Sequence, residues 1–210
     1  MKIFIFGDSF SCRFDDDNPW ARKYVKYKGY TPKNFGDIIG ELLGSEVINC
    51  AFSGLSNYDI FHTIIEKIES IQKDDIIIIE FSSVYRYRLV DKFGNFSSIS
   101  AQWNWLFHLF NESEDAIKEI GVNRTSKVYL TEIDDWIKSI TKMFPDNKTI
   151  FWTPFIESTG NPMIIPFYQF STIGEETDLA VNDTHYSETG HWDLANYILG
   201  KIKEVPKKML

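Results

Sequence analysis

Cysteine is scarce in this chain: among 210 residues only Cys12 and Cys50 are cysteines. Two cysteines cannot build a disulfide framework, and their spacing is not that of a zinc site. Long hydrophobic runs are missing too, since no apolar stretch approaches the roughly 18 residues that a membrane-spanning helix needs. The apolar run at residues 3–6 lacks the length and cleavage site of a signal peptide. We therefore expect a cytoplasmic protein, or a virion-associated one if the chain is phage-encoded.

An excess of positive charge is also lacking. The formal net charge is −8, which argues against binding to nucleic acid phosphates or to an anionic membrane. No glycine-rich phosphate-binding fingerprint follows the first predicted strand, which disfavours a nucleotide-binding or redox flavodoxin-like protein. Apolar residues make up 43% of the chain and charged residues 25%, the balance of a folded globular domain.

Short apolar runs alternate with helical patterns along most of the chain. Continuous β-branched or aromatic runs predict buried parallel strands, and the four isoleucines at 76–79 predict the central one. Such alternation predicts an α/β fold, a three-layer α/β/α flavodoxin-like domain with a parallel sheet of about five strands. The predicted strands are residues 3–6, 46–49, 76–79, 148–152 and 164–170, and the predicted helices are 34–43, 57–71, 130–144 and one from about 187.

We expect a single domain over residues 1–210, with a helical insertion at about 85–128. Within that insertion, residues 101–120 carry apolar side chains at roughly helical spacing. The segment between the first strand and residue 34 has the composition of a polar and aromatic loop.

Polar residues follow each predicted strand, at the sheet edge where α/β proteins bind their ligands. Ser9 comes directly after Gly7 and Asp8 at the end of the first strand. A serine hydroxyl needs an adjacent base to act as a nucleophile, and His185 stands where the chain returns to this edge. Asp183, two residues before the histidine, is the carboxylate that could orient its imidazole.

These features resemble the SGNH (GDSL-type) hydrolase family along nearly the whole chain. The first family block is similar to Gly7-Asp8-Ser9, the second to residues 49–54, and the last to the segment that holds Asp183 and His185. The tracts at 7–10 and 53–57 look especially like members without a signal peptide from bacteriophages and their hosts. The resemblance implies that Ser9 is the nucleophile, that the backbone N–H groups of Ser9 and Gly54 form the oxyanion hole, and that no metal or other cofactor is needed.

The chain departs from the family pattern twice. The third block usually supplies an asparagine to the oxyanion, but residues 81–84 contain none, so Ser82 or Ser83 would donate a hydroxyl, or the hole would rely on backbone N–H groups alone. Loss of one such donor costs roughly 10²–10³ in rate in other acyl-transfer enzymes. The usual position of the orienting acid is Asn182, so we expect Asp183 to act through a one-residue shift, the alternative being a weakened Ser–His dyad.

The resemblance implies a serine esterase that hydrolyses carboxylic esters, and the polar and aromatic loops favour O-acetyl groups on carbohydrate. Its partner would be a small-molecule or glycan ester; the oligomeric state is not predicted. The alternative is a catalytically degenerate domain that binds glycan or a partner protein. We predict substrate contacts from four polar residues near the strand ends: Asp8, Asn57, Ser82 and Arg86.

Several other residues have an ordinary structural interpretation. Free cysteines such as Cys12 and Cys50 are by default buried small side chains. His62 and His108 lie in predicted helices among apolar residues. His191 is expected to pack, or to cap the start of the last helix.

Overall fold

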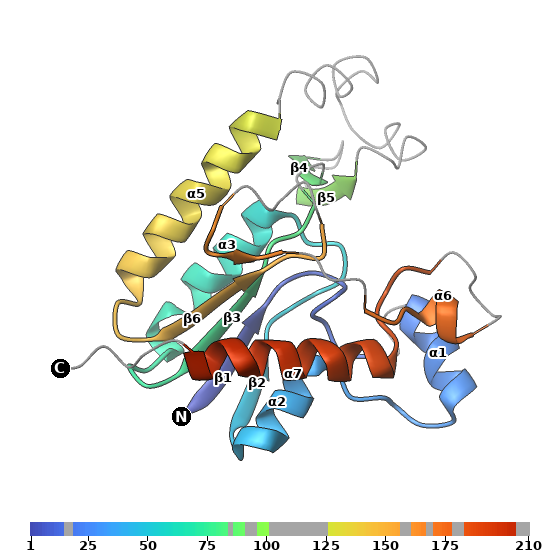
Figure 1. Ribbon diagram of the computed structural model, residues 1–210. Helices are drawn as coiled ribbons and strands as arrows, with labels where there is room; N and C mark the ends of the chain where they lie inside the picture. The colour runs from blue at the N-terminus through green and yellow to red at the C-terminus, as the bar shows by residue number, and fades with distance from the viewer. Residues whose placement is uncertain are drawn as a thin grey trace.

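A computed structural model shows a five-stranded parallel sheet with helices on both faces (Figure 1). It describes residues 1–14, 19–83, 86–90, 96–100, 126–155, 161–166, 170–177 and 183–204. The strand order is β2-β1-β3-β6-β7, and the strands are β1 (Lys2–Phe6), β2 (Glu46–Asn49), β3 (Ile76–Glu80), β6 (Lys148–Trp152) and β7 (Ile164–Ile165). The predicted α/β fold with a parallel sheet of about five strands is confirmed.

The isoleucine run lies at the centre of the sheet, as its composition predicts. All five residues of β3 are buried, because the strand pairs with β1 on one side and β6 on the other and helices cover both faces. A strand without a solvent-facing side needs no alternation of polar and apolar residues.

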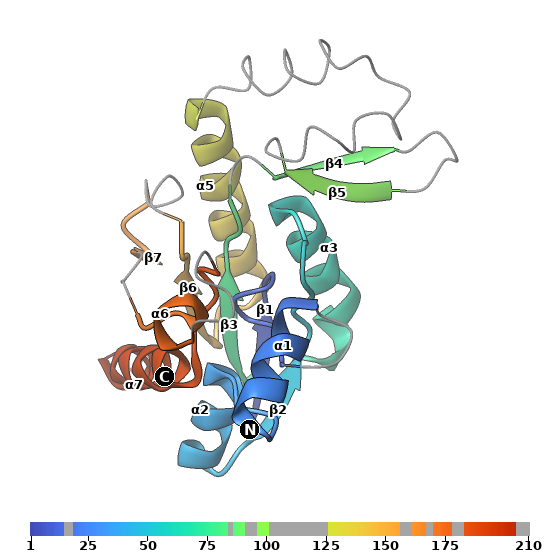
Figure 2. The ribbon, with the colours of Figure 1, turned by 90° about the vertical axis from the view of Figure 1, so that its right-hand side faces the viewer.

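Two helical layers enclose the sheet (Figure 2). Successive side chains of a strand point to opposite faces, so Phe4 and Phe6 pack with α3 (Asn57–Lys67) and α5 (Ser126–Met143), while Ile3 and Ile5 pack with α2 (Phe35–Leu43) and α7 (Glu188–Glu204). The two apolar clusters therefore make the predicted three layers.

The structure corrects the prediction between the first strand and residue 34. Residues expected as a loop include a helix, α1 (Pro19–Lys28). Proline suits the first position of a helix, and Ala21, Tyr24 and Val25 follow at helical spacing, so the signal was present in the sequence.

The predicted insertion differs as well. Its first part is an antiparallel hairpin of β4 (Arg86–Val90) and β5 (Phe96–Ser100), so the expectation of a helical segment is wrong for these residues. The stretch 101–125, including the helical pattern at 101–120 and His108, lies outside the described residues.

Further along the chain, two shorter elements complete the fold. Strand β7 ends at Ile165, earlier than predicted, because Pro166 has no N–H to continue the pairing. The short helix η1 (Ile68–Ser70) follows α3 within the range predicted as one helix, whereas α6 (Ile173–Glu176), before α7, was not predicted.

Candidate functional site

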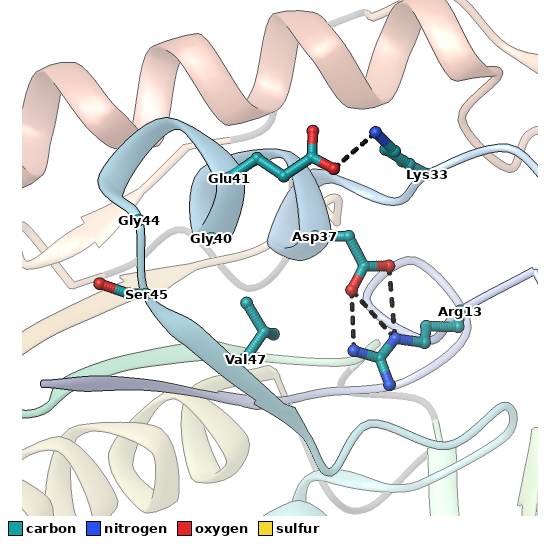
Figure 3. A pocket seen from close by; sticks show the side chains of 8 residues that line it. All are labelled: Arg13, Lys33, Asp37, Gly40, Glu41, Gly44, Ser45 and Val47. Carbon is teal, nitrogen blue, oxygen red and sulfur yellow. Dashed lines mark hydrogen bonds and ion pairs between the residues drawn. The ribbon is translucent and has the colours of Figure 1, made fainter.

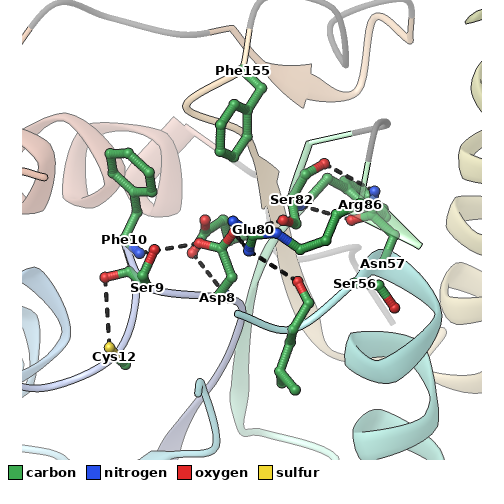
Figure 4. A network of polar contacts seen from close by, with 12 residues as sticks. Asp8, Ser9, Phe10, Cys12, Ser56, Asn57, Glu80, Ser82, Arg86 and Phe155 are labelled. Carbon is green, nitrogen blue, oxygen red and sulfur yellow. Dashed lines mark hydrogen bonds and ion pairs between the residues drawn. The ribbon is translucent and has the colours of Figure 1, made fainter. Parts of the chain in front are cut away.

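The turn after β1 presents Ser9 at the carboxyl edge of the sheet (Figure 4). The Asp8 carbonyl accepts hydrogen bonds from the N–H groups of Ser11 and Cys12 at 3.1 and 3.0 Å, and one Asp8 carboxylate oxygen accepts from the Phe10 N–H at 3.1 Å. These bonds fix a tight turn around Ser9. Within the described residues, neither the hydroxyl nor the N–H of Ser9 makes a hydrogen bond, so both are available to a ligand.

The loop after β2 lies against this turn. The Cys50 N–H donates to the Ile5 carbonyl at 2.8 Å, and the Phe52 N–H donates to the Gly7 carbonyl at 3.2 Å. Gly54 has a φ of +90°, a conformation that favours glycine. No contact of the Gly54 N–H is found among the described residues, so this second expected oxyanion donor is also unpaired.

Asp183 and His185 form a close pair. The distance between Asp183 Oδ1 and His185 Nδ1 is 2.6 Å, and the same oxygen accepts from the His185 backbone N–H at 2.9 Å. Burial alone would raise the pKa of the Asp183 carboxyl, but its hydrogen bonds with His185 outweigh burial and hold that pKa below its usual value. The carboxylate that touches the imidazole is thus Asp183, while Asn182 lies outside the described residues.

A short helix fixes the backbone of this pair. The N–H groups of Ile173 and Gly174, at the start of α6, donate to the carbonyls of His185 and Asp183 at 2.8 and 3.0 Å. The loop that carries the histidine is therefore anchored at both residues.

The histidine ring reaches the neighbourhood of the serine. The imidazole of His185 stacks on the ring of Phe10, the residue after Ser9, with ring centroids 5.1 Å apart and an interplanar angle of 29°. Since Nδ1 faces Asp183, a proton transfer with Ser9 would use Nε2. The Ser9 hydroxyl is not yet bonded to it; such bonds are often long in a structure without substrate and shorten in the complex.

Two buried carboxyl groups, those of Asp8 and Glu80, lie at the turn that carries Ser9. Asp8 is fully buried and accepts from the Ser82 hydroxyl at 2.5 Å and from Arg86 Nη1 at 2.6 Å. Burial pushes the pKa of Asp8 up, but hydrogen bonding with Glu80 and the charge of Arg86 bring it below its usual value. Burial and the charge of Asp8 raise the pKa of Glu80 well above its usual value, so of the two carboxyl groups Glu80 holds a proton more strongly and Asp8 carries the negative charge.

Three of the four residues expected to contact the substrate are buried and bonded to one another. Asp8 and Ser82 are fully buried, and Asn57 is 7% exposed. The Asn57 side chain accepts from the Ser82 N–H at 2.7 Å and donates to the Ser82 carbonyl at 2.9 Å. These side chains tie the ends of α3, β1 and β3 together.

Two other residues at the end of β3 differ in burial: Ser83 is partly exposed, whereas Glu80 is buried. The Ser83 carbonyl accepts from the Arg86 N–H at 3.1 Å. Glu80 was given no role by the sequence analysis; the signal was an acidic residue directly after four isoleucines in a strand buried on both faces.

Other predicted residues have structural positions. His191 is buried and its Nδ1 accepts from the Phe35 N–H at 3.2 Å, which confirms that it packs at the start of the last helix. Burial lowers the pKa of His191 to about 3. The buried Cys12 thiol donates to the Ser9 carbonyl at 3.5 Å, and burial raises the pKa of Cys50. His62 is an exposed residue of α3, contrary to the apolar surroundings expected for it.

Two concave regions lie elsewhere. A pocket of about 460 Å³ between α2 and β2 holds the ion pairs of Arg13 with Asp37 and of Lys33 with Glu41 (Figure 3). A groove of about 530 Å³ lies beside β6, β7 and α7. Neither is lined by Ser9 or His185. The described parts of the chain contain no group of three or more potential metal ligands and no helix long and apolar enough to cross a bilayer.

Comparison with known proteins found no matching family model and no matching curated sequence. Among solved structures, a lipase from a goat rumen metagenome aligns with a TM-score of 0.50 at 15% identity, over 95% of this chain and 96% of the lipase. An acetyl xylan esterase from Butyrivibrio proteoclasticus aligns with a TM-score of 0.46 at 15% identity, over 98% of this chain, which spans 64% of that esterase. A lipolytic protein of the G-D-S-L family from Desulfitobacterium hafniense aligns with a TM-score of 0.38 at 11% identity, over 96% of this chain and 98% of that protein.

The alignment with the lipase covers almost the full length of both chains, so it includes the layered sheet described above. At this identity it speaks for the fold alone. The chain therefore shares its three-layer α/β fold with this lipase.

Proposed function

We propose that the protein is a serine esterase that hydrolyses carboxylic esters, with O-acetylated carbohydrate as its substrate class. One observation carries the proposal: an Asp183–His185 pair, joined at 2.6 Å, stacks on Phe10 directly beside Ser9. A carboxylate, an imidazole and a hydroxyl in this order are the groups that acyl transfer through a serine requires.

In the first half of the proposed reaction, Ser9 Oγ attacks the ester carbonyl carbon while His185 Nε2 takes the hydroxyl proton. The Asp183 carboxylate stabilises the resulting imidazolium, and the unpaired N–H groups of Ser9 and Gly54 donate to the oxyanion. Collapse of the tetrahedral intermediate breaks the carbon–oxygen bond of the ester. The leaving alcohol departs with the proton from His185, and the acyl group stays on Ser9.

In the second half, water attacks the acyl-enzyme and gives a proton to His185 Nε2. The new tetrahedral intermediate collapses, the Ser9–acyl bond breaks, and the proton returns from His185 to Ser9 Oγ. The carboxylic acid leaves, and the enzyme regains its starting state.

Two exposed aromatic residues near Gly54 in sequence favour a carbohydrate substrate. Phe52 and Tyr58 are 62% and 52% exposed, and exposed apolar side chains can mark a ligand-binding surface. The polar loops around them fit a small acyl group better than a long chain. Support for ester hydrolysis in general comes from the lipase that shares the fold.

Replacement of Ser9 by alanine tests the proposal. S9A should abolish acetate release from p-nitrophenyl acetate and labelling by a fluorophosphonate probe, whereas S139A, which removes an exposed serine of α5, should keep both. Retention of wild-type turnover by S9A would refute the esterase assignment. A comparison of acetylated xylan with an octanoyl ester then tests the substrate class.

The second candidate, a domain that binds glycan or a partner protein without turnover, is favoured by the missing asparagine in the third block. It predicts no fluorophosphonate labelling of the folded wild-type protein at neutral pH. Labelling of Ser9 would exclude it, since phosphonylation requires an activated hydroxyl.

A further inference from the structure

The proposed oxyanion hole has two backbone donors and lacks its side-chain donor. Ser82 and Ser83 are the two serines that could replace the asparagine of the family pattern. The Ser82 hydroxyl donates its proton to Asp8 at 2.5 Å and is fully buried. A hydroxyl has one proton, so Ser82 cannot donate to an oxyanion while this bond is kept. Beside Ser83, a third donor can come from Arg86.

Arg86 joins the two chain segments that carry the backbone donors. Its Nη1 donates to Asp8 Oδ2 at 2.6 Å and to the Leu55 carbonyl at 3.2 Å. Asp8 directly precedes Ser9, and Leu55 directly follows Gly54. One guanidinium nitrogen thus bridges the two segments that carry the N–H groups of the proposed hole (Figure 4).

The other nitrogens of the Arg86 guanidinium make no hydrogen bond to the described residues. Among the described residues, the hydrogen bonds of the Arg86 side chain run through Nη1 only. Arg86 Nε is buried without a partner, although the side chain as a whole is 13% exposed. A buried, unpaired donor in a native structure calls for an explanation, and a ligand group absent from the free protein supplies one.

We propose that Arg86 is a catalytic residue that donates from its free N–H groups to the oxyanion, in place of the third-block asparagine. The inference rests on the proposed esterase function. Because the guanidinium is rigid and planar, the bonds of Nη1 to Asp8 and Leu55 also fix the direction of the remaining N–H groups.

The charge balance favours this role over recognition of an anionic substrate. Asp8 is ionised and lies 2.6 Å from Arg86, so the pair is neutral as a whole and attracts a distant anion weakly. Oriented N–H groups in a desolvated site still stabilise an oxyanion that forms beside them. Arg86 should therefore act on the transition state and leave the binding of the neutral ester unchanged.

Substitution of Arg86 by lysine tests the planar set of N–H donors separately from the positive charge. R86K keeps a cation beside Asp8 but loses the planar set of N–H groups, so kcat on p-nitrophenyl acetate should fall by about 10²–10³ with little change in KM. R13K is the matched control, because Arg13 also pairs with an aspartate, Asp37, at 2.8 Å, and is half exposed. R13K should keep the wild-type kcat.

A second variant, R86A, distinguishes a loss of catalysis from a loss of folding. R86A leaves space for an added cation, and millimolar guanidinium should restore part of kcat while methylammonium, which has the charge without the fork, should not. Thermal unfolding of each variant shows whether the fold is kept.

Each result decides the question. A wild-type kcat in R86K, a change confined to KM, or equal rescue by both cations would overturn the proposal; a KM effect would instead indicate an anionic substrate group. Loss of the fold in both variants would also overturn it, since Arg86 would then be a structural residue. Activity of S9A would refute the esterase function itself, whereas an inactive S9A beside a fully active R86K refutes only the role of Arg86.

Discussion

At the scale of single residues, the acid of the proposed triad sits one position later than the family spacing implies. Asp183 is held to His185 by two hydrogen bonds, one to the ring and one to the backbone N–H. An aspartate two residues before a histidine can make both bonds at once, because the loop turns back on itself. The shift therefore preserves the contact that orients the imidazole.

Replacement of Asp183 by asparagine should lower kcat on p-nitrophenyl acetate by about 10⁴, since an amide cannot stabilise the imidazolium and can hold the wrong tautomer. D193N is the control, because Asp193 is an exposed carboxylate of α7 close by in sequence. Equal activity of D183N and the wild type would mean that the carboxylate does not take part.

The residues of the proposed triad could be predicted from the sequence, but the buried polar residues next to them could not. Ser9 and His185 follow from strand ends and from the need of a hydroxyl for a base. The opposite pKa shifts of Asp8 and Glu80 depend on which side chains turn inward at the end of β3, and no periodicity encodes that. The burial of Asp8, Asn57 and Ser82 could not be predicted for the same reason: the sequence shows that these residues are polar but not that they are buried.

At the scale of elements, α1 braces the loop that carries the histidine. The Tyr24 hydroxyl donates to Glu176 of α6 at 2.9 Å and accepts from the Glu188 N–H at the start of α7, also at 2.9 Å. Lys28 bridges Glu176 and Glu188 at 3.1 and 2.9 Å. The sequence analysis missed this helix because its aromatic and charged residues mask a short apolar stripe.

Removal of the Tyr24 hydroxyl should weaken this brace. Y24F leaves the Glu188 N–H without its acceptor, so the free energy of unfolding should fall by about 1–3 kcal/mol. Urea unfolding measures the change, and Y27F, on an exposed ring of the same helix, should be neutral. A loss as large in Y27F as in Y24F would contradict the brace.

At the scale of the whole molecule, the three layers arise because successive apolar side chains of β1 and β3 point to opposite faces of the sheet. This part of the fold was predictable. The hairpin of β4 and β5 was not, because short runs of serine and aromatic residues fit a strand as well as a loop. One buried histidine joins two helices of the same layer: His191 of α7 accepts from the first N–H of α2 and packs against Phe14 and Phe35.

This histidine should make stability depend on pH. The pKa of His191 is about 3 in the folded protein and about 6.5 when unfolded, so the unfolded state binds the additional proton between these values. Stability is complete above about pH 6.5 and falls as the pH drops toward 3, by about 2–3 kcal/mol at about pH 4.5 from this group alone.

Urea unfolding at about pH 7.5 and pH 4.5 measures the effect. H191Q, which cannot take up a proton, should lose less stability between the two pH values than the wild type, while H62Q, at an exposed position on α3, should behave like the wild type. The same pH dependence in H191Q and in the wild type would assign the acid sensitivity to other groups.

The site is built from both ends of the described chain: the hydroxyl follows the first strand, and the imidazole comes just before the last helix. During synthesis, the whole stretch from β1 to the start of α7 must therefore leave the ribosome before the two can meet. A nascent chain stalled ahead of α7 would carry its serine without the base, and it should show no esterase activity.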